Sequence, residues 1–195
     1  MSTAWERLST ADRMVLAVEK VRERLLKTTA ALTAGGVRHA IAGGNAVAAH
    51  VARVEPAAVR NTQDVDVLLD RDDLSAAEAS MTAAGFEFRH AGGVSFFREP
   101  GGKFRDAVHL VFAGEKVRDE YVAAAPGLDE VDTRDAFPVV SLEALVRMKL
   151  TSFRDKDRTH LRDFIDVGLI DASWPGRFVA DLGDRLQALL DDPDG

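Results

Sequence analysis

The sequence predicts an α+β fold, with a mixed, largely antiparallel central sheet, flanking helices and a helical C-terminal portion. Two observations carry this prediction. Between residues 11 and 112, segments with the apolar spacing of helices occur among short runs of β-branched and aromatic residues. From Ser141 onward only the helical pattern recurs, and a run of helices set apart from the strands is typical of α+β folds.

Apolar residues at helical spacing predict six helices. The expected helices cover residues 11–33, 45–53, 72–84, 142–153, 158–170 and 175–190. Runs of β-branched and aromatic residues between glycine, proline or acidic residues predict five strands. The expected strands cover residues 37–42, 65–69, 86–90, 94–98 and 104–112. Glycine pairs separate the last three strands, so these strands should form an antiparallel meander.

The chain length of 195 residues fits one structural domain in two parts. We expect a core with an N-terminal helix over residues 1–140, and a helical portion over residues 141–195 that packs on it. Residues 120–138 form a long acidic loop, which either covers a site or is a surface excursion.

Composition excludes several classes of protein. There are no cysteines, so disulfides and thiolate metal sites are absent. No apolar run approaches the roughly 18 residues that span a bilayer, and we expect a cytoplasmic protein without membrane contact. The net charge of −7 argues against binding of an extended nucleic-acid duplex. Basic residues nevertheless gather between Arg147 and Arg162, as either a site for a small anion or a solvated helix face.

The most informative segment contains Asp64 and Asp66, at the start of the expected strand 65–69. Residues two apart on a strand point to the same face, about 6.5–7 Å apart, so the two carboxylates should project side by side. Divalent cations would supply the counter-charge that such a pair needs, as in phosphoryl and nucleotidyl transfer. Mg2+ prefers oxygen ligands of this kind. In the other interpretation, Asp64 is a turn residue and Asp66 faces solvent.

Gly43 and Gly44 close one expected strand and open the next helix. Glycine lets the backbone approach a ligand closely, and the first N–H groups of a helix can bind an anion. An ordinary strand-to-helix turn has the same local pattern. The glycine pair therefore indicates a ligand site only in combination with the aspartates that follow it.

In combination, strand, Gly43-Gly44, helix and Asp64-x-Asp66 resemble the nucleotidyltransferase superfamily related to DNA polymerase beta, over about residues 37–170. Arg60 and Thr62 match the arginine and threonine that precede the aspartates in bacterial toxin-like and antibiotic-modifying members.

The resemblance implies that Asp64 and Asp66 bind Mg2+ or Mn2+ and are catalytic. It also implies that a nucleoside triphosphate contacts other residues of the two motifs. These nucleotide-binding residues are Gly43, Gly44, Asn45, Arg60 and Thr62.

The family supplies a third carboxylate from a later strand, and in the expected strand 104–112 His109 occupies that place. Strand alternation puts Asp106 on the opposite face, so Asp106 cannot replace it simply. His109 is therefore a candidate metal ligand, better suited to Mn2+ or Zn2+ than to Mg2+. It could also be a general base or a half-buried structural residue.

Lys149 lies within the apolar stripe of the expected helix 142–153. Its ammonium must reach solvent or find an acidic or phosphate partner. The resemblance implies a catalytic, nucleotide-binding Lys149. Asp163 and Asp166 lie three residues apart on the next expected helix, where they could position Lys149 or pair locally.

These residues are compatible with three functions. The first is transfer of a nucleoside monophosphate from a triphosphate such as ATP to an unidentified hydroxyl acceptor on a protein, an RNA or a small molecule. The second, motivated by His109, is a catalytically impaired module that binds nucleotide. A toxin–antitoxin interaction module is a third interpretation, with residues 120–138 as the contact for an antitoxin partner.

Overall fold

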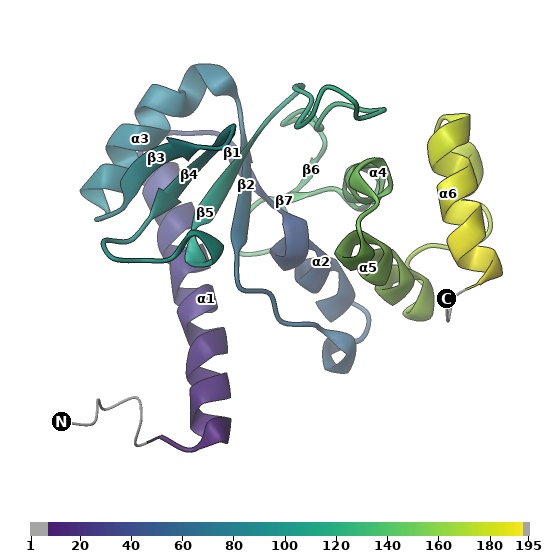
Figure 1. Cartoon of the computed structure of the whole chain (residues 1–195), viewed down its shortest axis with the longest axis horizontal. Coiled ribbons are helices and arrows are strands. Elements are labelled where there is room, and N and C mark those ends of the chain that lie inside the picture. Colours follow the sequence, from purple (N-terminus) through teal and green to yellow (C-terminus); the bar gives the residue numbers. More distant parts are fainter. Residues whose placement is uncertain (1–7, 193–195) are drawn as a thin grey trace.

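A computed structural model of the chain describes residues 8–192, and its centre is one sheet with the strand order β3-β4-β5-β2-β1-β7-β6 (Figure 1). The strands are β1 (His39–Ala42), β2 (Val65–Leu69), β3 (Glu87–Ala91), β4 (Val94–Arg98), β5 (Val108–Phe112), β6 (Val131–Asp132) and β7 (Val139–Val140). The β2–β5 and β1–β7 pairs are parallel, and the other neighbouring pairs are antiparallel. The predicted mixed, largely antiparallel sheet is confirmed.

The helices of the described chain are α1 (Thr10–Ala34), α2 (Gly43–Ala52), α3 (Leu74–Ala83), α4 (Leu142–Ser152), α5 (Asp155–Asp166) and α6 (Ala180–Asp191). Serine caps the first turn of two of them. The Ser9 side chain accepts a hydrogen bond from the Asp12 backbone N–H at the start of α1, and Ser141 accepts one from Ala144 at the start of α4. Each bond satisfies an N–H group that a helix leaves free at its first turn.

Helices cover both faces of the sheet, because alternate residues of the central strands are apolar on each side. On one face, Val65 and Val67 of β2 pack in a core with side chains of α1 and α3. On the other face, Leu68 packs in a second core with side chains of α2, α4, α5 and α6. Figure 1 shows this division, with α1 and α3 on one side of the strands and α2, α4, α5 and α6 on the other. Asp66 lies on the face of Leu68, next to α2.

The structure corrects the predicted strand 104–112. Residues Phe104–Asp106 form a turn of 3₁₀-helix, η4, and the strand β5 begins only at Val108. Asp106 therefore has no strand face, and alternation does not apply to it. The predicted helix 175–190 is also divided, since the short η5 (Pro175–Arg177) precedes α6 and Phe178 between them is extended.

Two short strands, β6 and β7, lie in and just after the acidic loop of residues 120–138. The pairing of Val139 with Ile41 joins β7 to β1, so the end of this loop extends the sheet. Two-residue strands have no periodicity to detect, and they exist because their neighbours offer hydrogen bonds. Among residues 8–192, no helix is long and apolar enough to cross a membrane.

Candidate active site

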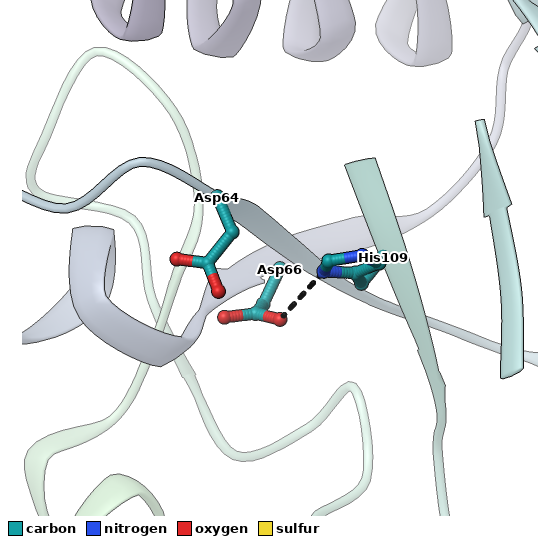
Figure 2. A group of neighbouring side chains, drawn as sticks. All are labelled: Asp64, Asp66 and His109. Atoms are coloured by element: carbon teal, nitrogen blue, oxygen red, sulfur yellow. Dashed lines mark ion pairs between the residues drawn. The ribbon is translucent and has the colours of Figure 1, made fainter. Parts of the chain in front are cut away.

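The side chains of Asp64, Asp66 and His109 converge at the end of the sheet (Figure 2). One ligand atom from each lies within 4.8 Å of the others. Asp64 immediately precedes β2, whereas Asp66 lies within it, and the parallel pairing of β2 with β5 places His109 beside Asp66. The fold thus brings together a carboxylate pair and an imidazole from separate segments.

The glycine turn is fitted to this site. The antiparallel pairing of β1 with β2 sets Ala42 opposite Asp66, so the start of α2 lies against the carboxylates. At Gly43, where φ is +60°, an added Cβ would lie 1.8 Å from Asp66 Oδ2. At Gly44, an added Cβ would lie 2.8 Å from Thr62 Oγ1. The glycines therefore make room for protein side chains, in addition to any ligand.

Asp64 is held by three contacts from neighbouring segments. The Thr62 hydroxyl donates a hydrogen bond of 2.6 Å to Asp64 Oδ1, and Lys156 Nζ lies 3.5 Å from Asp64 Oδ2. The Asn45 side-chain amide donates to the Asp64 backbone carbonyl at 2.8 Å, which ties α2 to β2. Burial acts to raise the pKa of Asp64, but the Thr62 hydrogen bond and the Lys156 charge outweigh it and leave the pKa below its usual value.

Asp66 has the opposite electrostatic balance. Burial raises the pKa of its carboxyl, and the negative charge of Asp64 raises it further, although positive charges nearby act the other way. His109 Nδ1 lies 3.9 Å from Asp66 Oδ1 (Figure 2). A divalent cation between the two carboxylates would relieve their repulsion more directly than these side chains do.

The donors present fit a divalent cation. Two carboxylates and one imidazole are ligands that Mn2+ accepts, and the carboxylates alone suit Mg2+. The His109 ring packs against Phe104, with centroids 4.7 Å apart, and its Nε2 is buried without a hydrogen-bond partner.

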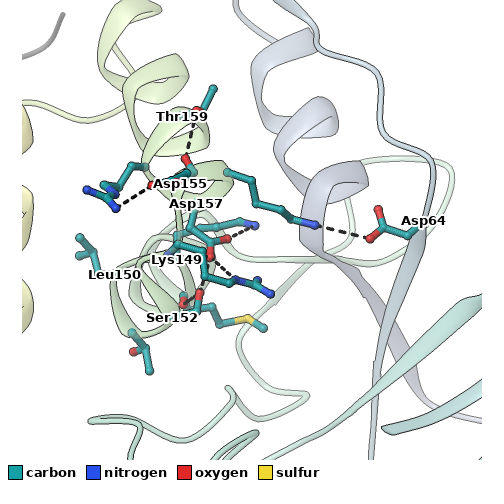
Figure 3. Close-up of polar contacts among 12 residues, drawn as sticks. Asp64, Lys149, Leu150, Ser152, Asp155, Asp157 and Thr159 are labelled. Atoms are coloured by element: carbon teal, nitrogen blue, oxygen red, sulfur yellow. Dashed lines mark hydrogen bonds and ion pairs between the residues drawn. The ribbon is translucent and has the colours of Figure 1, made fainter. Parts of the chain in front are cut away.

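Lys149 contacts Asp157. The sequence had suggested Asp163 and Asp166 as its partners. Its Nζ donates a hydrogen bond of 3.0 Å to Asp157 Oδ1, and both side chains are buried (Figure 3). The prediction was wrong because α5 begins at Asp155, three residues earlier than expected. Phe153, in a left-handed conformation with φ of 47°, ends α4 and lets α5 start almost at once, so that Asp157 comes within reach.

Asp157 is the centre of this small network (Figure 3). Its carboxylate also accepts hydrogen bonds from Ser152 and from the Arg154 side chain, at 2.7 and 2.8 Å. Burial alone would raise the pKa of Asp157, but the charge of Lys149 and the hydrogen bonds outweigh it and hold the pKa far below its usual value. Lys149 remains in the wall of the cleft described below, as a cation with a fixed partner.

Asp163 instead holds Arg60. The Arg60 Nε donates to both carboxylate oxygens of Asp163, at 2.8 and 2.9 Å, and Asp166 adds a weaker electrostatic attraction. This contact ties the segment before β2 to α5. Arg60 is mostly exposed, so part of its guanidinium remains available for other contacts.

A cleft of about 710 Å3 opens over the three converging side chains. One wall is the turn between β3 and β4, with Gly92 and Gly93, and another is the loop after β5, which includes Arg118 and Tyr121. The third wall comes from α4 and α5. Most cations of the basic stretch 147–162 are paired with acids, so the stretch does not form one free positive patch.

Sequence reasoning missed Lys156 and Asp157 as site residues. Lys156 belongs to the basic stretch, but no spacing in the sequence shows that it alone reaches Asp64. Asp157 could be found only by knowing where α5 begins. Both positions depend on packing between elements rather than on a local motif.

Comparison with solved structures shows the class of fold. The chain is similar to an antigenic nucleotidyltransferase-like protein from Paracoccidioides brasiliensis, with a TM-score of 0.57 and 20% identity over 91% of each chain. It is also similar to ANT(2'')-Ia in complex with adenylyl-2''-tobramycin, with a TM-score of 0.51 and 15% identity over 91% of this chain and 99% of that one. The solution structure of the antibiotic-resistance factor ANT(2'')-Ia gives a TM-score of 0.50 and 16% identity, over 89% and 90% of the two chains.

The protein therefore has the nucleotidyltransferase fold that its sequence motifs predicted. No protein-family model matches the sequence, and a search of curated proteins found no match. At this level of identity, the structural resemblance establishes the fold alone.

Proposed function

We propose that this protein is a metal-dependent nucleotidyltransferase, which transfers a nucleoside monophosphate from a nucleoside triphosphate to a hydroxyl group of an acceptor. The convergence of Asp64, Asp66 and His109 beside the glycine turn carries this proposal. A pair of adjacent carboxylates with an opposed electrostatic balance is a feature of functional sites. It lies in a cleft large enough for a nucleotide.

Asp64, Asp66 and His109 would hold the divalent cation, Mg2+ or Mn2+. The cation would supply positive charge to the phosphoryl oxygens and to the developing charge of the transition state. The first turn of α2 has no side-chain cap, so its backbone N–H groups are free to bind a phosphate. Lys149 contributes a further positive charge from the cleft wall.

The acceptor would enter by the part of the cleft that the metal ligands do not occupy. One of the similar structures is ANT(2'')-Ia in complex with adenylyl-2''-tobramycin, so in that protein this fold accommodates an adenylylated small molecule. For the present chain, we propose a hydroxyl-bearing acceptor of unspecified class, which a protein, an RNA or a small molecule could provide.

A direct experiment uses nucleoside triphosphates labelled at the α-phosphate. The protein is incubated with each labelled triphosphate, Mg2+ or Mn2+, and a cell extract, and transfer of label to any acceptor is measured. Asp64→Asn and Asp66→Asn should abolish transfer, because each removes a charged ligand. Asp155→Asn is the matched control, since the Asp155 side chain is 97% exposed. Transfer that persists in both ligand variants would contradict the proposal.

The position of His109 favours one other function. An imidazole stands beside Asp66 where the resembling family has a carboxylate, so the site could bind nucleotide without turning it over. Calorimetry that shows nucleotide binding, together with no label transfer, would favour this second function. A gain of transfer in His109→Asp would then identify the imidazole as the cause.

A further inference from the structure

One cation reaches the carboxylate pair from across the cleft. Lys156, the second residue of α5, places its Nζ 3.5 Å from Asp64 Oδ2, and Figure 3 draws this ion pair. The Lys156 side chain is 49% exposed, whereas that of Asp64 is 23% exposed. The lysine is therefore more solvated than its partner.

The other cations at this end of the cleft are engaged elsewhere. Lys149 and Arg154 both bind Asp157, whose side chain is fully buried. If these two cations moved away, the buried carboxylate of Asp157 would lose its counter-charges, which is costly. Lys156 pairs instead with the partly exposed Asp64, and an ion pair at this exposure is weak.

Lys156 partly replaces a metal ion in electrostatic terms. Its ammonium lies 3.5 Å from Asp64 Oδ2, so it offsets part of the negative charge of the carboxylate pair. A divalent ion that binds Asp64 takes the same carboxylate oxygens and repels the ammonium. The metal and the lysine therefore compete for one ligand.

We propose that Lys156 is a displaceable internal counter-ion: it neutralises Asp64 until a divalent cation binds, and then contacts the phosphates of the triphosphate. The proposal rests on the proposed function, which supplies the metal and the triphosphate. A lysine suits both positions, because its ammonium is a compact charge with three donors on a flexible stem.

Removal of Lys156 should have two effects that removal of an ordinary surface lysine would not have. Loss of Lys156 removes a competitor of the metal, so metal binding by the nucleotide-free protein becomes tighter. The same loss removes a partner of the phosphates, so triphosphate binding becomes weaker. The two effects have opposite signs in one variant.

The first measurement is a Mn2+ titration of the nucleotide-free protein, followed by electron paramagnetic resonance. Lys156→Gln should bind Mn2+ about threefold more tightly, which is the range expected from losing one partly exposed ion pair. Lys156→Arg keeps the charge and should resemble the wild type. Arg158→Gln removes one charge from the same helix, where Arg158 pairs with the exposed Asp155, and should leave Mn2+ affinity unchanged.

The second measurement is calorimetry with adenosine 5'-(α,β-methylene)triphosphate at saturating Mn2+. Lys156→Gln should bind this analogue about tenfold more weakly, as expected for loss of one charge-assisted hydrogen bond. Arg158→Gln should again bind like the wild type. Thermal melting checks that all three variants are folded at the temperature of the titrations.

The outcomes separate this inference from the proposed function. If the wild type binds no Mn2+, or binds it equally well in Asp64→Asn and Asp66→Asn, the metal centre itself is wrong and the proposed function fails with it. If Mn2+ binding depends on both aspartates but Lys156→Gln leaves either affinity unchanged, or shifts either in the other direction, only the counter-ion proposal is wrong.

Discussion

Gly43 and Asp66 approach each other so closely that no side chain fits between them. An added Cβ at Gly43 would lie 1.8 Å from Asp66 Oδ2 and 2.9 Å from Asp66 Cβ. The glycine turn and the carboxylate pair are therefore one structural unit, although about twenty residues separate them in the sequence. Substitutions at Gly43 and His109 test the site, and substitutions at Asp157 and His160 test the stability of the fold.

Gly43→Ala should disrupt the site as well as the backbone. The left-handed conformation alone costs about 1 kcal/mol for a non-glycine residue, and the clash displaces the Asp66 carboxylate in addition. We expect Mn2+ affinity to fall about tenfold or more, in line with loss of a ligand's geometry. Calorimetric Mn2+ titration measures this effect.

Gly36→Ala is the matched control for that variant. Gly36 also has a positive φ, of +70°, but a Cβ there would meet no atom within 4 Å. It should lose about 1 kcal/mol of stability in urea unfolding, the cost of the left-handed conformation alone, and keep its Mn2+ affinity. Equal Mn2+ affinities for the two alanine variants would show that the close approach of Gly43 to Asp66 does not contribute to metal binding.

Asp157→Asn should destabilise the protein strongly. It leaves the buried ammonium of Lys149 without its charged partner, and breaking one side of a buried pair costs about 3 kcal/mol or more. Urea unfolding at pH 7.5 measures the difference. Asp155→Asn, two residues earlier and almost fully exposed, should change stability by less than about 0.5 kcal/mol. Similar unfolding midpoints for the two variants would contradict the role given to Asp157.

Acidification should destabilise the protein through His160. Burial, assisted by the charge of Lys149, lowers the pKa of His160 to about 4 from its ordinary value of 6.5. Between these pH values the unfolded chain binds a proton that the folded protein does not, so stability falls as the pH drops from about 6.5 toward 4. Since the ring is partly solvated, the loss should be about 1 kcal/mol.

Urea unfolding at pH 7.5 and pH 5 measures this loss. His160→Gln should reduce the difference between the two pH values, and His90→Gln, at an exposed position, should not. His39 and His50, whose pKa values burial also lowers, retain part of the dependence in both variants. An unchanged pH dependence in His160→Gln would exclude this residue as its source.

His109 should set the choice of metal. With an imidazole as third ligand, the wild type is expected to prefer Mn2+ to Mg2+. His109→Asp supplies a third carboxylate, which favours Mg2+, so the preference for Mn2+ should fall about tenfold. Competition of Mg2+ against bound Mn2+ gives the ratio directly. His109→Ala, which offers no ligand, should weaken both metals, and a ratio that is the same in all three proteins would refute the prediction.

The sequence predicted those parts of the site that are local. Gly43, Gly44, Asp64 and Asp66 lie in short motifs whose geometry follows from a strand and a tight turn, and the sheet brings them together. The order of the strands in the meander could also be predicted, because glycine pairs separate the strands.

The partners of the charged side chains could not be predicted in the same way. Lys149 pairs with Asp157, and Asp163 with Arg60, because α5 begins directly after the left-handed Phe153. The helix predicted from the sequence began at Arg158 and left Asp157 outside it, whereas α5 carries Asp157 in its first turn. Sequence patterns do not locate the first residue of a helix accurately enough to predict which side chains pair between two helices.

The register of the parallel pairing between β2 and β5 determines which side chain of β5 faces the carboxylates. His109 faces Asp66 only because Val108 and Leu110 are seated in the core on either side of it. A slip of one residue would present an apolar side chain to the carboxylates and bury the imidazole among hydrophobic residues. The pairing of these two apolar strands thus determines which side chain faces the carboxylates. Core substitutions that loosen the pairing should move the imidazole away from them without touching the cleft.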